Sequence, residues 1–89
     1  MDARWLQRRV YGADRDVTDP GPQEGREYVE LVGGPLDGLL LDVTGLPEAD
    51  RADGAALITD AGRFGPGGRA SYGPALARPW AWLWEGDIP

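Results

Sequence analysis

The sequence predicts an all-β fold: a small antiparallel sheet of four or five strands, curled or barrel-like, that follows an N-terminal arm. Three observations predict it. Short apolar and β-branched segments alternate with clusters of glycine and proline, which is the pattern of strands joined by turns. Of the 18 Val, Ile, Leu and Phe residues, 15 lie after residue 26. The chain also has 14 glycines, and glycine permits the sharp bends that a curled sheet requires.

Residues 1–26 are expected to form the arm. Residues 3–11 are compatible with a short helix, because Asp2 suits its N-cap and Gly12 suits its C-terminal stop. A helix of this length is marginal in water unless it docks on a surface. Residues 13–26 are rich in aspartate, glycine and proline, which predicts an acidic linker. The β domain is therefore expected over residues 27–89.

The domain begins with a predicted β-hairpin. Residues 27–32 alternate, with Val29 and Leu31 on one face and Glu30 on the other. The Gly-Gly-Pro-Leu-Asp-Gly segment at 33–38 is a dense turn signal. Residues 39–43 then form the second strand, and their alternation places Leu39, Leu41 and Val43 toward the core.

The remaining elements are shorter. Residues 44–54 form a loop, in which Pro47 suits the first turn of a short helix. Residues 55–59 predict a third strand, residues 60–70 are expected to be largely irregular because they hold four glycines and one proline, and residues 71–72 add a short pairing segment. The last strand is expected near residues 79–86.

The last strand carries three alternating tryptophans, Trp80, Trp82 and Trp84, so their indoles are expected on one face. We favour the interpretation that all three fill the core, because the chain has only one phenylalanine. Two alternatives stay open. The rings could form a stacking platform for sugars or exposed bases, or they could lie on an edge strand that pairs with a second copy.

The chain lacks the residue types on which several catalytic and metal-binding chemistries depend. The chain has no His, no Cys and no Lys, so it offers no imidazole base, thiolate, disulfide, zinc site of the usual kind, Schiff base or Walker-type phosphate loop. The acidic residues Glu48, Asp50 and Asp53 match no calcium-loop spacing and are expected to form a solvated rim. We therefore expect no catalytic residue, no metal site and no cofactor.

The net charge is −6, which opposes direct binding to nucleic acid. Residues 61–79 contain Arg63, Arg69 and Arg78 and no acid. These arginines are expected to pair with the acidic rim of the same molecule or of a neighbouring copy. No apolar run approaches the roughly 20 residues that span a bilayer, so we expect no membrane association and a cytoplasmic location.

Two motifs resemble a known group. The segment Glu30 to Gly38 and the segment Trp80 to Trp84, with its Gly-Asp-Ile-Pro tail at 86–89, resemble small uncharacterised proteins of high-GC actinobacteria and their phages. Tyr72-Gly73-Pro74 fits the same outline. The resemblance covers residues 27–89 and implies a chromosomal, mobile-element or phage origin. It transfers no functional residue.

These observations favour a non-enzymatic module that binds a protein partner or a second copy of itself. Its expected interaction residues are Trp80, Trp82, Trp84, Glu48, Asp50, Asp53, Arg63 and Arg69. The first alternative is an acidic DNA mimic that blocks a DNA-binding protein. The second is a carbohydrate-binding module or a hydrolase that uses carboxylates only.

Overall fold

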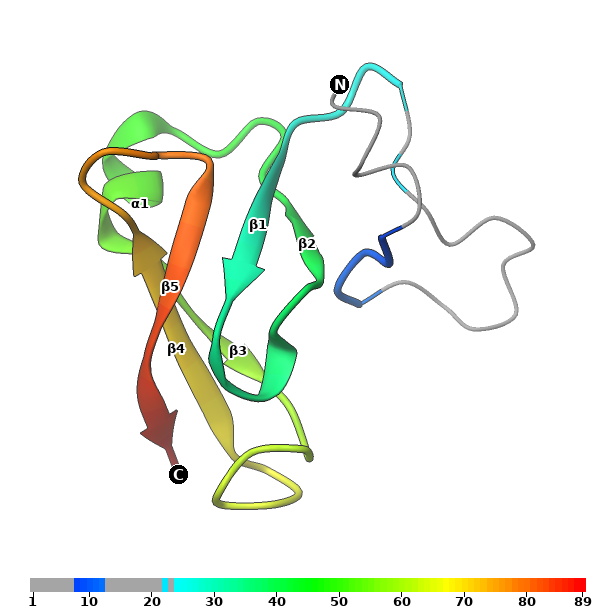
Figure 1. Cartoon of the computed structure of the whole chain (residues 1–89), viewed down its shortest axis with the longest axis vertical. Coiled ribbons are helices and arrows are strands. Elements are labelled where there is room, and N and C mark those ends of the chain that lie inside the picture. The colour runs from blue at the N-terminus through cyan, green and yellow to red at the C-terminus, as the bar shows by residue number, and fades with distance from the viewer. Residues whose placement is uncertain (1–7, 13–21, 23) are drawn as a thin grey trace.

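The computed structural model describes residues 8–12, 22 and 24–89. Five strands form one curled sheet, a half-barrel, which confirms the β-rich fold (Figure 1). The strands are β1 (Tyr28–Val32), β2 (Leu40–Asp42), β3 (Ala55–Ile58), β4 (Arg69–Pro74) and β5 (Ala81–Ile88). Their order across the sheet is β2-β1-β5-β4-β3. The strands are joined in part by a 3-10 turn, η2 (Gly34–Leu36), and a short helix, α1 (Glu48–Asp53).

The sheet is mixed rather than fully antiparallel. Three neighbouring pairs, β1–β2, β3–β4 and β4–β5, are antiparallel as expected, but β1 and β5 run parallel, with Leu31 opposite Trp82. A parallel pair needs a long connection, and the chain between β1 and β5 contains three other strands and a helix. β5 lies between β1 and β4, so the alternative in which the tryptophans lie on an edge strand is wrong.

The helix α1 occupies the segment where the sequence allowed one. Pro47 stands at its N-cap and Gly54 at its C-cap. Gly54 has a φ of 72°, and a Cβ at this position would lie 2.2 Å from the carbonyl oxygen of Tyr72. Glycine is required here because α1 turns directly into β3 against the backbone of β4.

The core lies on the concave side of the sheet. It consists of Val29, Leu31, Leu36, Val43, Leu57, Ala70, Tyr72 and Trp82. Leu39 and Leu41 pack against this core half-buried, as their alternation predicts, but Leu40 is fully buried too. Alternation predicts that Leu40 points away from the core and is exposed. It is buried instead because the N-terminal segment lies beside it.

Only one of the three strand tryptophans belongs to the core. Trp82 is 1% exposed, whereas Trp80 and Trp84 are 49% and 44% exposed. The expectation that all three indoles fill the core is wrong for two reasons. β5 begins at Ala81, so Trp80 lies in the preceding turn, and Trp84 lies against the backbone of Gly34.

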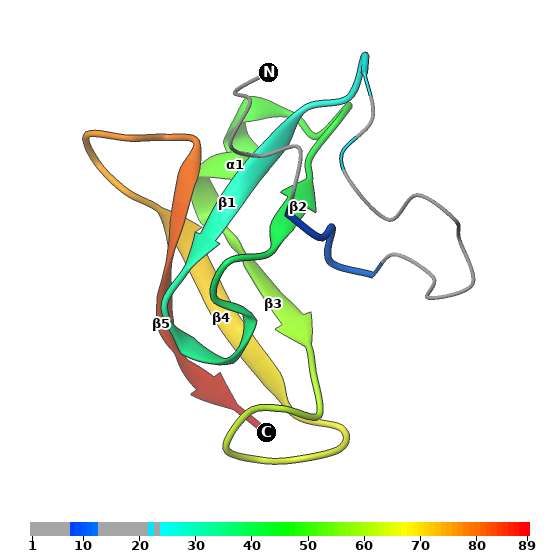
Figure 2. The ribbon, with the colours of Figure 1, turned by 45° about the vertical axis from the view of Figure 1, so that its right-hand side comes forward.

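The N-terminal segment at residues 8–12 runs beside β2 (Figure 2). The amide of Leu40 donates to the carbonyl of Arg9 at 2.8 Å, and the amide of Tyr11 donates to the carbonyl of Leu40 at 2.7 Å. The Tyr11 hydroxyl then donates to the carbonyl of Ile58 in β3 at 2.7 Å. Tyr11 thus connects the strands at the two ends of the sheet.

Residues 8–12 are not helical: Val10 forms a β-bridge with Leu40, and the residues around it form bends and turns. The rest of the helix expected over residues 3–11 lies outside the described residues, as does most of the linker expected over 13–26. No helix in the described part of the chain is long and apolar enough to cross a membrane.

Candidate binding groove

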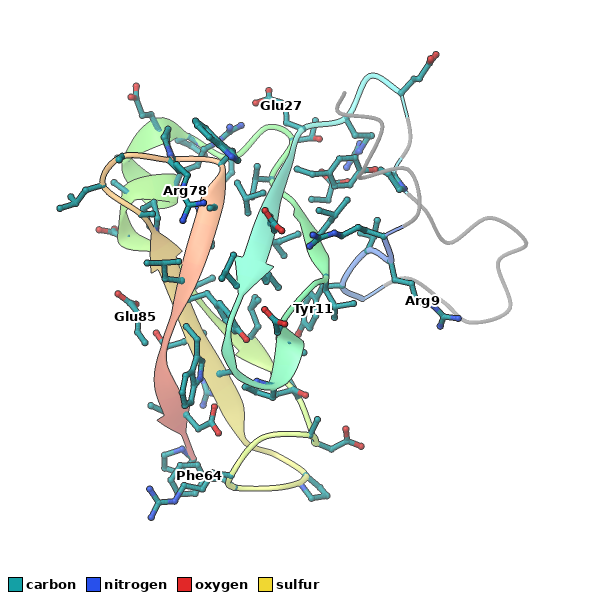
Figure 3. The ribbon with its side chains drawn as sticks, in the orientation of Figure 1. Arg9, Tyr11, Glu27, Phe64, Arg78 and Glu85 are labelled. Carbon is teal, nitrogen blue, oxygen red and sulfur yellow. The ribbon has the colours of Figure 1, made fainter. Side chains whose placement is uncertain are left out.

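A groove of about 670 Å³ lies where α1, the start of β1 and the turn before β5 meet. Figure 3 shows Glu27 and Arg78 at the same end of the molecule as α1, and Phe64 at the opposite end. The groove is lined by Glu27, Tyr28, Val29, Leu46, Glu48, Arg51, Ala52, Pro74, Pro79, Trp80 and Trp82. Most of these side chains are apolar or aromatic, and three of them are charged.

Trp80 is the largest exposed side chain in the groove. The peptide group that follows it is fixed, because the Trp80 carbonyl accepts from the amide of Glu30 at 2.7 Å and the amide of Ala81 donates to the carbonyl of Arg78 at 2.9 Å. The buried rings of Tyr28 and Trp82 also line the groove. The groove therefore presents a half-exposed indole on a backbone that is already ordered.

Arg51 carries the only positive charge in the lining, and its guanidinium makes three hydrogen bonds. Its Nε donates to the carbonyl of Leu46 at 2.8 Å and its Nη2 to the carbonyl of Val43 at 3.0 Å. Its Nη1 donates to the Glu27 carboxylate at 2.8 Å. Arg51 thus holds the loop before α1 and neutralises Glu27, and each nitrogen of its head group already has a partner.

The two carboxylates of the groove differ in their surroundings. The hydrogen bond from Arg51, and then its positive charge, lower the pKa of Glu27 below its ordinary value, which keeps this carboxylate ionised at neutral pH. Glu48 is exposed in the first turn of α1 and has no hydrogen-bond or ion-pair partner among the described residues. Glu48 therefore supplies the uncompensated negative charge of the groove.

The structure divides the interaction residues expected from the sequence. Trp80, Trp82 and Glu48 come together in the groove. Asp50 and Asp53 are exposed on the same helix but do not line it. The other three, Trp84, Arg63 and Arg69, lie at the far end of the sheet around β4 and the end of β5.

At that far end, the side chain of Trp84 and the backbone of Arg63 are bonded within the fold. Trp84 donates from Nε1 to the Asp87 carboxylate at 3.0 Å, and the same carboxylate accepts from the backbone amide of Arg63 at 2.7 Å. The guanidinium of Arg63 lies 5.8 Å from the ring centre of Phe64. Among the described residues, the ion pairs to carboxylates come from Arg8, Arg26 and Arg51. The expected pairing of Arg63, Arg69 and Arg78 with an acidic rim of the same molecule is therefore not observed.

The Gly-Gly-Pro turn and the tryptophan strand meet each other in the fold. The Tyr72 hydroxyl donates to the carbonyl of Gly33 at 2.6 Å and accepts from the amide of Leu36 at 3.0 Å. A Cβ on Gly34 would lie 2.4 Å from the indole of Trp84. Tyr72 and Trp84 of the motif segments thus hold the turn onto the sheet, whereas Pro74, Trp80 and Trp82 of the same segments line the groove.

Sequence reasoning missed Glu27, Tyr28 and Arg51 as parts of the site. One signal was present, because Arg51 is the only basic residue in the acidic stretch from Asp37 to Asp60. The described residues contain no group of three His, Cys, Asp or Glu side chains that could hold a metal ion.

Comparison with known proteins adds no relative. No protein-family model matches this sequence, and no curated protein or solved structure shows significant similarity to it.

Proposed function

We propose that this chain is a non-enzymatic protein-interaction module that binds a short segment of a partner protein in the groove beside Trp80. The half-exposed indole of Trp80 carries the proposal. Tryptophan is among the residues that contribute most to binding energy at protein interfaces. Because hydrogen bonds already order the backbone around Trp80, a partner would bind it at a low entropic cost.

The size and lining of the groove support a peptide-like ligand. Its volume, about 670 Å³, lies within the range of small-ligand sites and accommodates a few residues. Pro74, Pro79 and the aromatic rings give it rigid apolar walls. Aromatic-lined grooves of this kind dock extended segments in several interaction domains, because an extended segment loses little conformational entropy on binding.

Selection from a random peptide library displayed on phage tests the proposal. Peptides selected by the wild-type chain should bind Trp80→Ala about thirtyfold more weakly, which is the ~2 kcal/mol effect of a hot-spot residue. Leu76→Ala is the matched control, because Leu76 is a fully exposed apolar residue in the same turn that does not line the groove. Equal binding to both variants, or no enriched peptide, would contradict the proposed function.

A saccharide ligand is the second candidate. The groove brings Glu27 and Glu48 together with Trp80, which is the set of residues that a carboxylate-based hydrolase or a sugar-binding site uses. The ion pair with Arg51 works against a hydrolase, because it lowers the pKa of Glu27 whereas a general acid needs a raised one. Oligosaccharide titrations followed by tryptophan fluorescence separate this candidate from a peptide ligand.

The distribution of carboxylates does not favour a DNA mimic. Three of them, Glu27, Glu30 and Asp42, are paired with Arg51, Arg8 and Arg26. Asp37 and Asp87 accept hydrogen bonds at the turn and at the end of β5. Phosphate imitation requires free carboxylates in a one-sided row.

The proposal keeps the expectations of a cytoplasmic location and a phage or mobile-element origin, which cell fractionation and the neighbouring genes would test.

A further inference from the structure

We infer that the groove selects a basic residue of its partner, with the arginine or lysine side chain lying on the indole of Trp80 and its charge beside Glu48. This inference rests on the proposed function and assigns the chemistry of the bound segment. Three observations carry it: the exposure of the indole, the carboxylate of Glu48, which has no partner among the described residues, and the pairing of the one cation of the lining, Arg51, with Glu27.

The exposed face of an indole attracts a cation. Guanidinium and ammonium groups bind tryptophan faces through the ring quadrupole, and tryptophan is the strongest such partner among the aromatic residues. The apolar stem of an arginine or lysine would at the same time cover the aromatic and proline walls of the groove. Trp80 is half-exposed, so the ring is accessible to such a side chain.

The charges of the groove favour the same ligand. Arg51 and Glu27 neutralise each other at 2.8 Å, so Glu48 is left as the uncompensated charge of the lining. The whole chain has a net charge of −6, which also attracts a basic segment at long range.

An acidic or phosphorylated segment would meet the opposite conditions. The Arg51 guanidinium already donates to the carbonyls of Leu46 and Val43 and to the Glu27 carboxylate, so three of its five N–H groups are occupied and its charge is paired. Arg78, the nearest cation in sequence to Trp80, precedes Pro79 but does not line the groove. A bound anion would therefore meet the negative charge of Glu48 and a cation whose charge Glu27 already pairs.

Two synthetic peptides test the inference: acetyl-Pro-Pro-Arg-Pro-Pro-amide and the same peptide with norleucine in place of arginine. Binding is followed by the NMR signal of the Trp80 indole N–H in the full chain, assigned by its loss in Trp80→Phe. The arginine peptide should bind about fivefold more tightly at low salt, as expected for a solvent-exposed cation–π contact combined with one ion pair. Screening in about 0.5 M NaCl should reduce this difference.

The matched variants are Glu48→Gln and Asp50→Asn. Both remove one negative charge from the first turn of α1, but only Glu48 lines the groove. Glu48→Gln should reduce the preference for arginine, and Asp50→Asn should leave it unchanged.

Equal binding of the two peptides, with both still dependent on Trp80, would overturn the inference and leave the proposed function standing. An equal effect of the two variants would overturn it as well. Failure of both peptides to shift the Trp80 signal would contradict the inference. The unbiased peptide selection would then decide the proposed function separately.

Discussion

Arg51 links the stability of the chain to its groove. The side chain is only partly exposed. It joins the loop that follows β2, through the carbonyls of Val43 and Leu46, to Glu27, the residue that precedes β1. Charged donors bonded to backbone carbonyls stabilise a fold more than neutral donors do, and removing such a donor leaves its acceptors without a partner.

Replacing Arg51 with methionine should therefore lower the free energy of unfolding by about 2 kcal/mol, because the carbonyls of Val43 and Leu46 lose their donor. Urea denaturation of the purified variant measures this effect. Arg69→Met provides the control, since Arg69 is exposed and forms no side-chain bond among the described residues. Equal midpoints for the two variants would show that Arg51 contributes no more than an ordinary surface residue.

Tyr72 introduces a pH dependence on the alkaline side. Burial is the main cause that raises the pKa of its hydroxyl above the ordinary value of 10.0. The folded chain thus keeps this proton at pH values where the unfolded chain has lost it. Stability should be complete below about pH 10 and should fall as the pH rises further.

The Tyr72→Phe variant should be less stable by about 1–3 kcal/mol at neutral pH, because the buried amide of Leu36 and the carbonyl of Gly33 lose their shared partner. It should also lose part of the alkaline decline in stability. Urea titrations at neutral pH and above pH 10 measure both effects. A variant that declines as steeply as the wild type would assign the pH dependence to other groups.

Among the elements, the turn between β1 and β2 is held against β5 by a close contact. Gly34 and Gly38 both have positive φ values, 66° and 91°. A Cβ on Gly34 would collide with the Trp84 indole, whereas a Cβ on Gly38 would meet no atom within 4 Å. The two positions thus share the same kind of backbone strain and differ in steric contact.

Gly38→Ala should destabilise the chain by roughly 1–2 kcal/mol through backbone strain alone. Gly34→Ala should cost about 1–3 kcal/mol more, because Trp84 must move. Thermal unfolding measures both values. In a Trp84→Ala background the difference between the two alanine variants should disappear, and its persistence would show that the indole is not the cause.

The two edges of the sheet are unequal. The N-terminal segment bonds along β2, whereas β3 has a partner strand on one side only. The amide of Thr59 bonds to Gly68, so by alternation the backbone groups of Ala56 and Ile58 point away from β4. Ile58 is 68% exposed, and the Tyr11 hydroxyl is bound to its carbonyl. A short edge of this kind is where a second copy could pair.

Tyr11→Ala should remove the side-chain contact with β3 and thereby weaken the anchoring of the N-terminal segment on β2, whose bonds are made by the backbone. The Leu40 amide, which donates to Arg9, should then exchange with deuterium faster than in the wild type. Arg9→Ala serves as the control, because this side chain points away from the sheet and its backbone contact is unchanged (Figure 3).

Light scattering of the Tyr11→Ala variant would also show whether an uncovered edge promotes self-association. Equal exchange rates in both variants would contradict the role of Tyr11.

At the scale of the whole molecule, binding and folding are coupled, because the groove is built from α1, β1 and the turn before β5. A ligand at tenfold its dissociation constant should raise the free energy of unfolding by about 1.4 kcal/mol. A thermal-shift assay with a selected peptide measures this increase. Trp80→Ala at the same peptide concentration should show a much smaller shift, and an equal shift would place the binding site elsewhere.

Local patterns were sufficient for the hairpin and for the positions of β1, β2, β3 and β5, but β4 (Arg69–Pro74) is longer than the pairing segment expected at 71–72. The alternation of Val29 and Leu31 predicted a buried face that both residues occupy. The parallel pairing of β1 with β5 could not be predicted, because no local pattern specifies which distant strands become neighbours. The tryptophan pattern failed for a related reason. Alternation assigns a common face, but the start of β5 and the glycine backbone beside Trp84 decide which rings are covered.

The site was predicted in part. Glu48, Trp80 and Trp82 were singled out from the sequence, and they do meet in the groove. Tyr28 and Glu27 reach the same groove from a segment about 50 residues before Trp80, and only the folded sheet brings them there.

The central place of β5 has a consequence for biosynthesis. β5 lies between β1 and β4, so these two strands belong to one sheet only after the tryptophan-bearing β5 is inserted. A ribosome-bound chain would thus expose its apolar faces until that segment leaves the exit tunnel. Assembly of the sheet therefore waits for β5, and a truncated product that lacks this strand should be a substrate for proteases and chaperones rather than a partly folded domain.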